Sequence, residues 1–217
     1  MAGPLHLVRE RWRRWWQGRL PRTDTLALTQ RNVYILPTRP GLFLAATLAV
    51  LLVASINYQL NLGYGLTFLL AGSALSAMHV AHGTLRGLRL ALATPQPAFA
   101  GSGATVAITL SNPGRRARHA VGLAVLEAGQ ERRWAWCMVP AGSQATVHLT
   151  LRPARRGRLP LPLLTAETRF PLGIFRVWSL WRPAAGLLVY PAPEPHAPPL
   201  PPGEPQAGAE RAAPGAQ

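Results

Sequence analysis

The distribution of apolar side chains divides the chain into segments of different period. Residues 41–78 form thirty-eight consecutive positions without a charged side chain. As one α-helix this run would be roughly 57 Å long, nearly twice the ~30 Å hydrocarbon core of a bilayer. The polar residues at 57–61 and the glycines at 63 and 65 indicate where it turns back. The pattern therefore predicts two transmembrane helices, about 40–57 and 62–82, folded as a hairpin, with a shallow re-entrant hairpin as the alternative.

After Arg86 the apolar positions recur every second residue, which is typical of strands with one buried face. Val106, Ile108 and Leu110 give the first long run of this kind. The other runs lie at 89–92, 121–125, 134–138, 147–151, 161–170, 174–181 and 186–190. Glycine and proline turns join these strands, and no helical pattern separates them. The expected fold class is therefore membrane α+β, with the hairpin followed by an antiparallel immunoglobulin-like β-sandwich.

One of these runs has an unusually bulky apolar face. Trp134, Trp136 and Met138 alternate with Ala135 and Cys137. We expect Cys137, on the opposite face from the tryptophans, to be a structural thiol.

The two ends of the chain differ in composition from its middle. Leu5, Val8, Trp12, Trp15 and Trp16 recur at helical spacing with arginines between them, which predicts a basic amphipathic segment at a membrane surface. One alternative is that this segment binds single-stranded nucleic acid, which basic and aromatic residues together also suit. Another is a disordered tail that only contributes positive charge on the cytoplasmic side. From 191 onward the chain is rich in Pro, Ala and Gly, which predicts disorder. The expected domains are a leader (1–32), the hairpin (33–85), a cytoplasmic sandwich (86–190) and a tail (191–217).

The charge distribution orients the predicted hairpin. The chain carries 23 basic and 8 acidic residues, and every basic one is arginine. Arginines precede the first apolar segment and follow the second, and the turn between them has none. Because cytoplasmic flanks retain positive charge, both termini are expected in the cytoplasm. The absence of lysine favours a GC-rich genome, so part of the +15 net charge is compositional.

Two groups of residues are candidate sites within this arrangement. Residues suited to the membrane–water interface are Trp12, Trp15, Trp16, Arg39, Tyr58 and Tyr64. Small residues at i,i+4 spacing, suited to close helix packing, are Gly72, Ser73, Ser76 and Ala77. We expect the second group to pack within the hairpin, with a seam between two copies as the alternative.

The chain lacks the residue patterns of an enzyme. It has a single aspartate, no lysine and no nucleophile elbow, phosphate-binding loop or zinc-spaced Cys/His cluster. Glu127 and Glu131 flank a predicted turn, where no cleft would tune their acidity. His79 and His82 have no acidic or cysteine partner nearby for a metal ion. We therefore expect a non-enzymatic protein without cofactor or metal.

Several strings along the chain match one family in order. YILPTRPG at 34–41, INYQLNLGY at 56–64 and HGTLRGL at 82–88 resemble bacterial membrane proteins of the family called domain of unknown function 58. Later strings at 99–101, 110–113, 155–157 and 169–176 are similar to the same family. Together they cover about 33–191.

The resemblance implies a place and a set of partners. In that family a hairpin and β-domain precede a von Willebrand factor A-like domain, and the genes lie beside those of MoxR-type AAA+ ATPases and other membrane proteins. It implies a multi-pass protein of the bacterial inner membrane, with the lipid bilayer and such an ATPase or other membrane proteins as partners. The A-like domain is not encoded in this sequence, so no residue here matches its metal-binding site. We therefore expect a truncated product. The predicted role is a membrane-anchored scaffold; nucleic-acid binding through the leader is the alternative.

Overall fold

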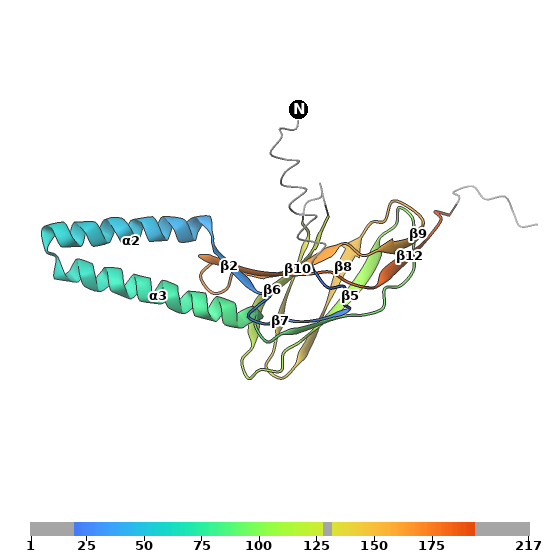
Figure 1. Cartoon of the computed structure of the whole chain (residues 1–217), viewed down its shortest axis with the longest axis horizontal. Helices are drawn as coiled ribbons and strands as arrows, with labels where there is room; N and C mark the ends of the chain where they lie inside the picture. Colours follow the sequence, from blue (N-terminus) through green and yellow to red (C-terminus); the bar gives the residue numbers. More distant parts are fainter. Residues whose placement is uncertain (1–19, 128–131, 194–217) are drawn as a thin grey trace, which may run out of the picture.

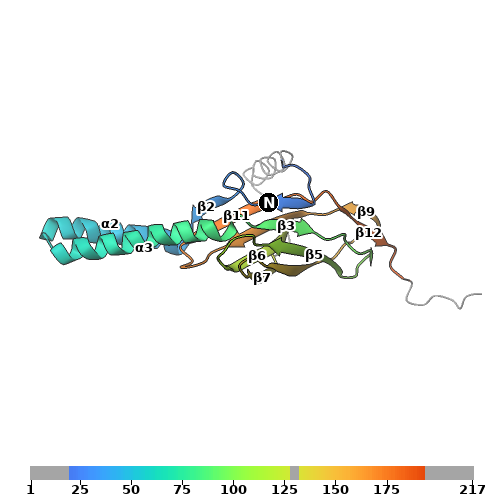
Figure 2. The same ribbon diagram turned by 90° about the horizontal axis from the view of Figure 1, so that it is seen from below.

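Two long helices project from one side of a β-domain (Figure 1). The computed structural model describes residues 20–127 and 132–193. Within these residues, nearly all strand pairs are antiparallel, and β4 with β12 is a parallel exception. The α+β class is therefore confirmed. Seen from below, the helices again extend away from the strands (Figure 2).

The helices begin and end for local reasons. α2 (Arg39–Tyr58) follows Thr38, whose hydroxyl accepts a hydrogen bond from the Gly41 amide at 3.3 Å. It ends at Gln59, which adopts a left-handed conformation with φ 53°. After this short turn α3 (Asn61–Leu85) runs back. The predicted pair of helices and the position of the reversal are confirmed, although α3 extends three residues beyond the predicted 82.

The strands form three sheets, which together make up what we call the β-domain. The four-stranded sheet has the order β1 (Thr25–Ala27), β3 (Arg89–Leu92), β5 (Ala104–Ser111) and β8 (Gln144–Leu151). The five-stranded sheet has the order β2 (Tyr34–Pro37), β11 (Phe175–Trp181), β10 (Leu163–Thr168), β6 (Arg118–Leu126) and β7 (Trp134–Val139). The smallest has the order β4 (Ala98–Phe99), β12 (Gly186–Tyr190) and β9 (Gly157–Pro160).

The main core lies between the four-stranded and five-stranded sheets. On β5 the predicted inward set is buried: Ile108 and Leu110 lie in this core, and Val106 lies in a second, smaller cluster. Across the core, β6 contributes Val121 and Leu123, which are also fully buried. This apolar layer stabilises the β-domain because each buried aliphatic side chain contributes about 1.5–3 kcal/mol.

The predicted domain boundaries need correction at the N-terminal side. The sequence pattern predicts a leader over 1–32 and the hairpin over 33–85. In the structure, β1 pairs with β3 and β2 pairs with β11, so both short strands belong to the β-domain. The hairpin is therefore an insertion between strands of the β-domain, not a segment that precedes it. The leader residues 1–19 and the tail residues 194–217 lie outside the described residues.

The bulky face of β7 is not the face that packs into the core. Ala135, Cys137 and Val139 pack toward the core, whereas Trp136 and Met138 remain 51% and 53% exposed. The reason is visible on the neighbouring strand, where Gly122 leaves room for the Trp136 ring. A Cβ at Gly122 would lie 2.7 Å from that ring. The indole thus covers the outer surface of the sheet.

Candidate functional site

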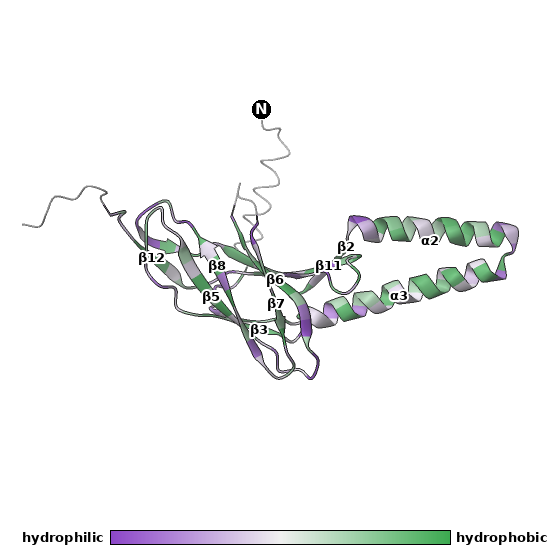
Figure 3. Cartoon of the chain, turned by 180° about the vertical axis from the view of Figure 1, so that it is seen from behind, coloured by the Kyte–Doolittle hydropathy of each residue, from purple (hydrophilic) through white to green (hydrophobic). Residues whose placement is uncertain are grey.

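The surface of the hairpin is the most unusual feature of the described structure. Both helices are long and apolar enough to cross a membrane, yet only 6% of the apolar window of α2 and 17% of that of α3 is buried. Helices of this composition inside a water-soluble protein are mostly buried. The exposed aliphatic and phenylalanine residues of the two helices are Leu42, Phe43, Val50, Val53, Ile56, Leu62, Leu66, Phe68, Leu69, Leu70, Leu75 and Val80. In Figure 3 the ribbons of both helices, which we call the apolar band, are largely coloured as hydrophobic, with hydrophilic residues at the tip and near the β-domain.

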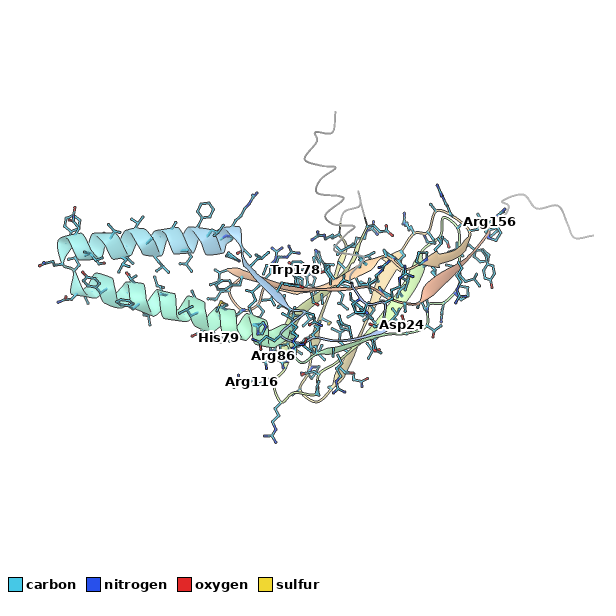
Figure 4. All side chains as sticks on the ribbon, in the orientation of Figure 1. Asp24, His79, Arg86, Arg116, Arg156 and Trp178 are labelled. Carbon is cyan, nitrogen blue, oxygen red and sulfur yellow. The ribbon has the colours of Figure 1, made fainter. Side chains whose placement is uncertain are left out.

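Charged and tyrosine side chains lie at the two ends of this band. Arg39 is the first residue of α2, and Arg86 follows the last residue of α3. His79 and Arg86 lie where α3 approaches the β-domain (Figure 4). At the opposite end, Tyr58 is exposed and Tyr64 is half-buried. Arg39 and Tyr58 are thus separated by the whole of α2, roughly 30 Å. The other predicted interface residues, Trp12, Trp15 and Trp16, lie outside the described residues.

The small residues predicted to pack between the helices are mostly not at their contact. Gly72, Ser73 and Ser76 are exposed, and a Cβ added to Gly72 would meet no atom within 4 Å. Only Ala77 is buried. The close approach lies instead near the tip, where a Cβ at Gly63 would overlap with Ser55 Oγ and lie 3.0 Å from its Cβ. Ser55, which is fully buried, is the residue of α2 that Gly63 of α3 contacts, and the sequence pattern does not indicate it.

This close approach yields a test of the hairpin contact. Replacing Gly63 by leucine is expected to destabilise helix pairing by about 1–2 kcal/mol, because the added atoms have no room beside Ser55. The matched control is Gly72→Leu on the open side of the same helix, expected to have little effect. Disulfide formation between engineered cysteines on α2 and α3 would report the pairing. Equal crosslinking in both variants would contradict the assigned contact.

The C-terminal end of α3 is anchored inside the β-domain. Ala81 and Leu85 belong to the main core, together with Leu88. The Arg118 guanidinium donates a hydrogen bond to the carbonyl of Gly83. Burial, and to a lesser extent Arg116, lowers the pKa of Arg118 below the usual arginine value. Arginine nevertheless stays protonated at neutral pH, so this contact is charge-assisted.

The N-terminal end of α2 is held by a loop between two strands of the five-stranded sheet. The amide of Thr38 donates to the carbonyl of Ile174 at 2.9 Å. The Thr38 hydroxyl donates to the carbonyl of Gly173 at 2.7 Å. Gly41, one turn into the helix, presses against the same loop, because an added Cβ would overlap with the Ile174 oxygen. Both helices therefore join the β-domain through tight contacts.

A charged and aromatic cluster lies on the outer face of the five-stranded sheet. Glu167 is 1% exposed and accepts hydrogen bonds from Arg169 at 2.9 Å and Arg176 at 2.7 Å. The Arg176 guanidinium also lies 5.7 Å from the centre of the Trp178 ring, which contacts Tyr34. No sequence pattern indicates this cluster, because its members come from three strands and the loop between β10 and β11.

The remaining candidate chemistry is sparse in the described part of the chain. Over residues 20–127 and 132–193, no three His, Cys, Asp or Glu side chains lie close enough together to hold a metal ion. Burial raises the pKa of the Cys137 thiol, which keeps it protonated and poorly nucleophilic at neutral pH. Of Glu127 and Glu131, the second lies outside the described residues, so the structure does not place the two relative to each other.

Comparisons with known proteins add no relative. No family model matches the chain, and no curated protein matches it at a significant level of similarity. The features that bear on function are therefore the hairpin surface and its junction with the β-domain.

Proposed function

We propose that the protein is a non-enzymatic membrane-anchored scaffold, in which α2 and α3 cross the bilayer and hold an immunoglobulin-like β-sandwich at the cytoplasmic face. The observation that carries the proposal is the exposed apolar surface of two helices that bury so little within the fold. In this arrangement the apolar band is covered by lipid tails. Backbone groups need no water there, because both helices satisfy their own hydrogen bonds.

Lipid is energetically more favourable than water around the hairpin. Twelve aliphatic and phenylalanine side chains of α2 and α3 are exposed. At about 1.5–3 kcal/mol for complete burial of each, transfer of their exposed surface out of water yields on the order of 10 kcal/mol or more. This is comparable with the whole stability of a typical domain, about 5–15 kcal/mol. An environment that covers the hairpin therefore contributes as much as the fold itself.

The charge distribution supports the orientation. Arg39 and Arg86 lie at the same end of the hairpin as the β-domain, and the tip carries no charged side chain. Arginines are retained on the cytoplasmic side. We therefore assign the β-domain and both chain ends to the cytoplasm, and the Gln59–Leu60 turn to the opposite side of the membrane.

The shape of the β-domain supports the role of an interaction module. Its two larger sheets enclose one core, as in an immunoglobulin-like sandwich. By its resemblance to the domain of unknown function 58 family, we propose a bacterial inner-membrane location and a MoxR-type ATPase or other membrane proteins as partners. The alternative of nucleic-acid binding depends on Trp12, Trp15 and Trp16, which lie outside the described residues.

Reporter fusions test the membrane topology. Alkaline phosphatase, active only outside the cytoplasm, would be inserted after Leu60 at the hairpin tip or fused after residue 193. We expect high phosphatase activity at the tip and low activity after 193, and the reverse pattern for a fluorescent protein that folds only in the cytoplasm. Low phosphatase activity at both positions would contradict a hairpin that crosses the membrane.

A further inference from the structure

The loop between β10 and β11 lies beside the first turn of α2. Thr38 binds the carbonyls of Gly173 and Ile174, and Gly41 contacts Ile174. In Figure 1 the loop lies on the hairpin side of the β-domain, near the ends of both helices. Its depth in a membrane is therefore fixed by the depth of the α2 N-terminus.

The length of α2 sets that depth. Its 20 residues give a helix of roughly 30 Å, which equals the thickness of the hydrocarbon core. With the hairpin inserted as proposed, no turn of α2 is left over as a spacer, and Arg39 lies at the membrane boundary. α3 has 25 residues, and its extra length is the part that enters the β-domain core at Ala81 and Leu85. The loop at 169–174 consequently lies at the level of the lipid headgroups.

The loop has the side chains suited to this level. Leu172 is 59% exposed at its tip, next to Gly173 in a left-handed conformation with φ 72°. The amide of Gly173 donates to the carbonyl of Arg169 at 2.8 Å, which closes the turn and presents the leucine outward. An apolar tip flanked by arginine is typical of segments at a membrane interface.

The charges near the loop are mainly positive. Arg39 and Arg169 are exposed, and Arg176 is partly exposed. The nearby acidic group, Glu167, is buried beneath the arginines and neutralises one positive charge. A net positive surface at headgroup depth attracts anionic phospholipid.

We propose that this loop is a second membrane contact, in which Leu172 enters the headgroup region of the bilayer and the surrounding arginines bind the phosphates of anionic lipids. The inference rests on the proposed function, because it requires the hairpin to be inserted. It adds that the β-domain lies flush against the membrane in one fixed orientation. The free face of the β-domain for a protein partner is then the end opposite the hairpin.

Quenching of a site-specific fluorophore by brominated lipids would measure the contact between the loop and the membrane. The full chain, with Cys137→Ala, would carry one environment-sensitive fluorophore on a cysteine at Leu172, Val50 or Arg156. The three variants would be reconstituted in vesicles containing phosphatidylglycerol, with bromine atoms placed either high or deep in the acyl chains. Val50 lies near the middle of α2, and Arg156 lies at the far end of the β-domain (Figure 4).

We expect high-placed bromine to quench the fluorophore at 172 more than deep bromine, the opposite order at 50, and no quenching at 156. Replacing phosphatidylglycerol by phosphatidylcholine should weaken quenching at 172 and leave it unchanged at 50. Absence of quenching at 172 with strong quenching at 50 would overturn the loop contact while leaving the hairpin in the membrane. Quenching at 172 that is independent of the anionic lipid would overturn the arginine–phosphate part. Absence of quenching at 50 would overturn the proposed function itself.

Discussion

Replacing Gly41 by alanine is expected to lower the free energy of unfolding of the β-domain by about 3 kcal/mol, at the upper end of the usual cost of overpacking. The added methyl group would overlap with the carbonyl oxygen of Ile174, and a backbone atom cannot rotate away as a side chain can. The loop would have to leave the first turn of α2 and lose its hydrogen bonds with Thr38. Urea unfolding in detergent micelles, followed by tryptophan fluorescence, would measure the loss.

The expected loss of stability is opposite in sign to the effect of this substitution on an isolated helix. Alanine is favoured over glycine in a helix by roughly 1 kcal/mol, so the same change should stabilise a helix without the contact. Gly65→Ala is the matched control, because a Cβ there would meet no atom within 4 Å. A Gly41→Ala variant as stable as the Gly65→Ala variant would show that the helix does not press against the loop.

Replacing Arg176 by leucine is expected to cost about 3 kcal/mol, because it leaves a carboxylate oxygen of the buried Glu167 without its cation. Glu167 is 1% exposed, so water cannot replace the lost partner. Urea is the appropriate denaturant, since a guanidinium salt would screen the remaining ion pair.

Arg169→Leu is the matched comparison for this prediction. Arg169 binds the other oxygen of the same carboxylate but is 58% exposed. Its removal should cost at most about 1 kcal/mol, as for an ordinary surface ion pair. Equal losses in the two variants would argue against the assignment of Arg176 as the principal partner of Glu167.

The strands that were predicted correctly have long alternating patterns. Val106, Ile108 and Leu110 on β5 repeat often enough to reveal a buried face. β1 and β2 have only three and four residues, too few for a period to be recognised. On β7 the pattern identified the strand, but two apolar faces alternate there and the pattern does not reveal that Ala135 and Cys137 pack toward the core. The choice depended on Gly122 of the neighbouring strand, which accommodates Trp136.

The candidate site was also predictable only in part from the sequence. Composition pointed to Arg39, Tyr58 and Tyr64 as residues at the two ends of an apolar span, and the structure places them there. The i,i+4 spacing of Gly72 and Ser76 could not reveal which side of α3 faces α2. That side is set at the tip by Gly63 against Ser55.

The sequence by itself determined the two apolar helices, their reversal and the presence of a strand-rich domain, because each depends on residues close together along the chain. Only the tertiary structure decided that the hairpin is inserted into the β-domain and joined to it at both ends. Thr25 faces Ala91 and Tyr34 faces Trp178, so these pairings bring together segments far apart in sequence. The conformational entropy lost in closing such loops is offset only when the whole core forms. No local pattern of residues therefore reveals these pairings.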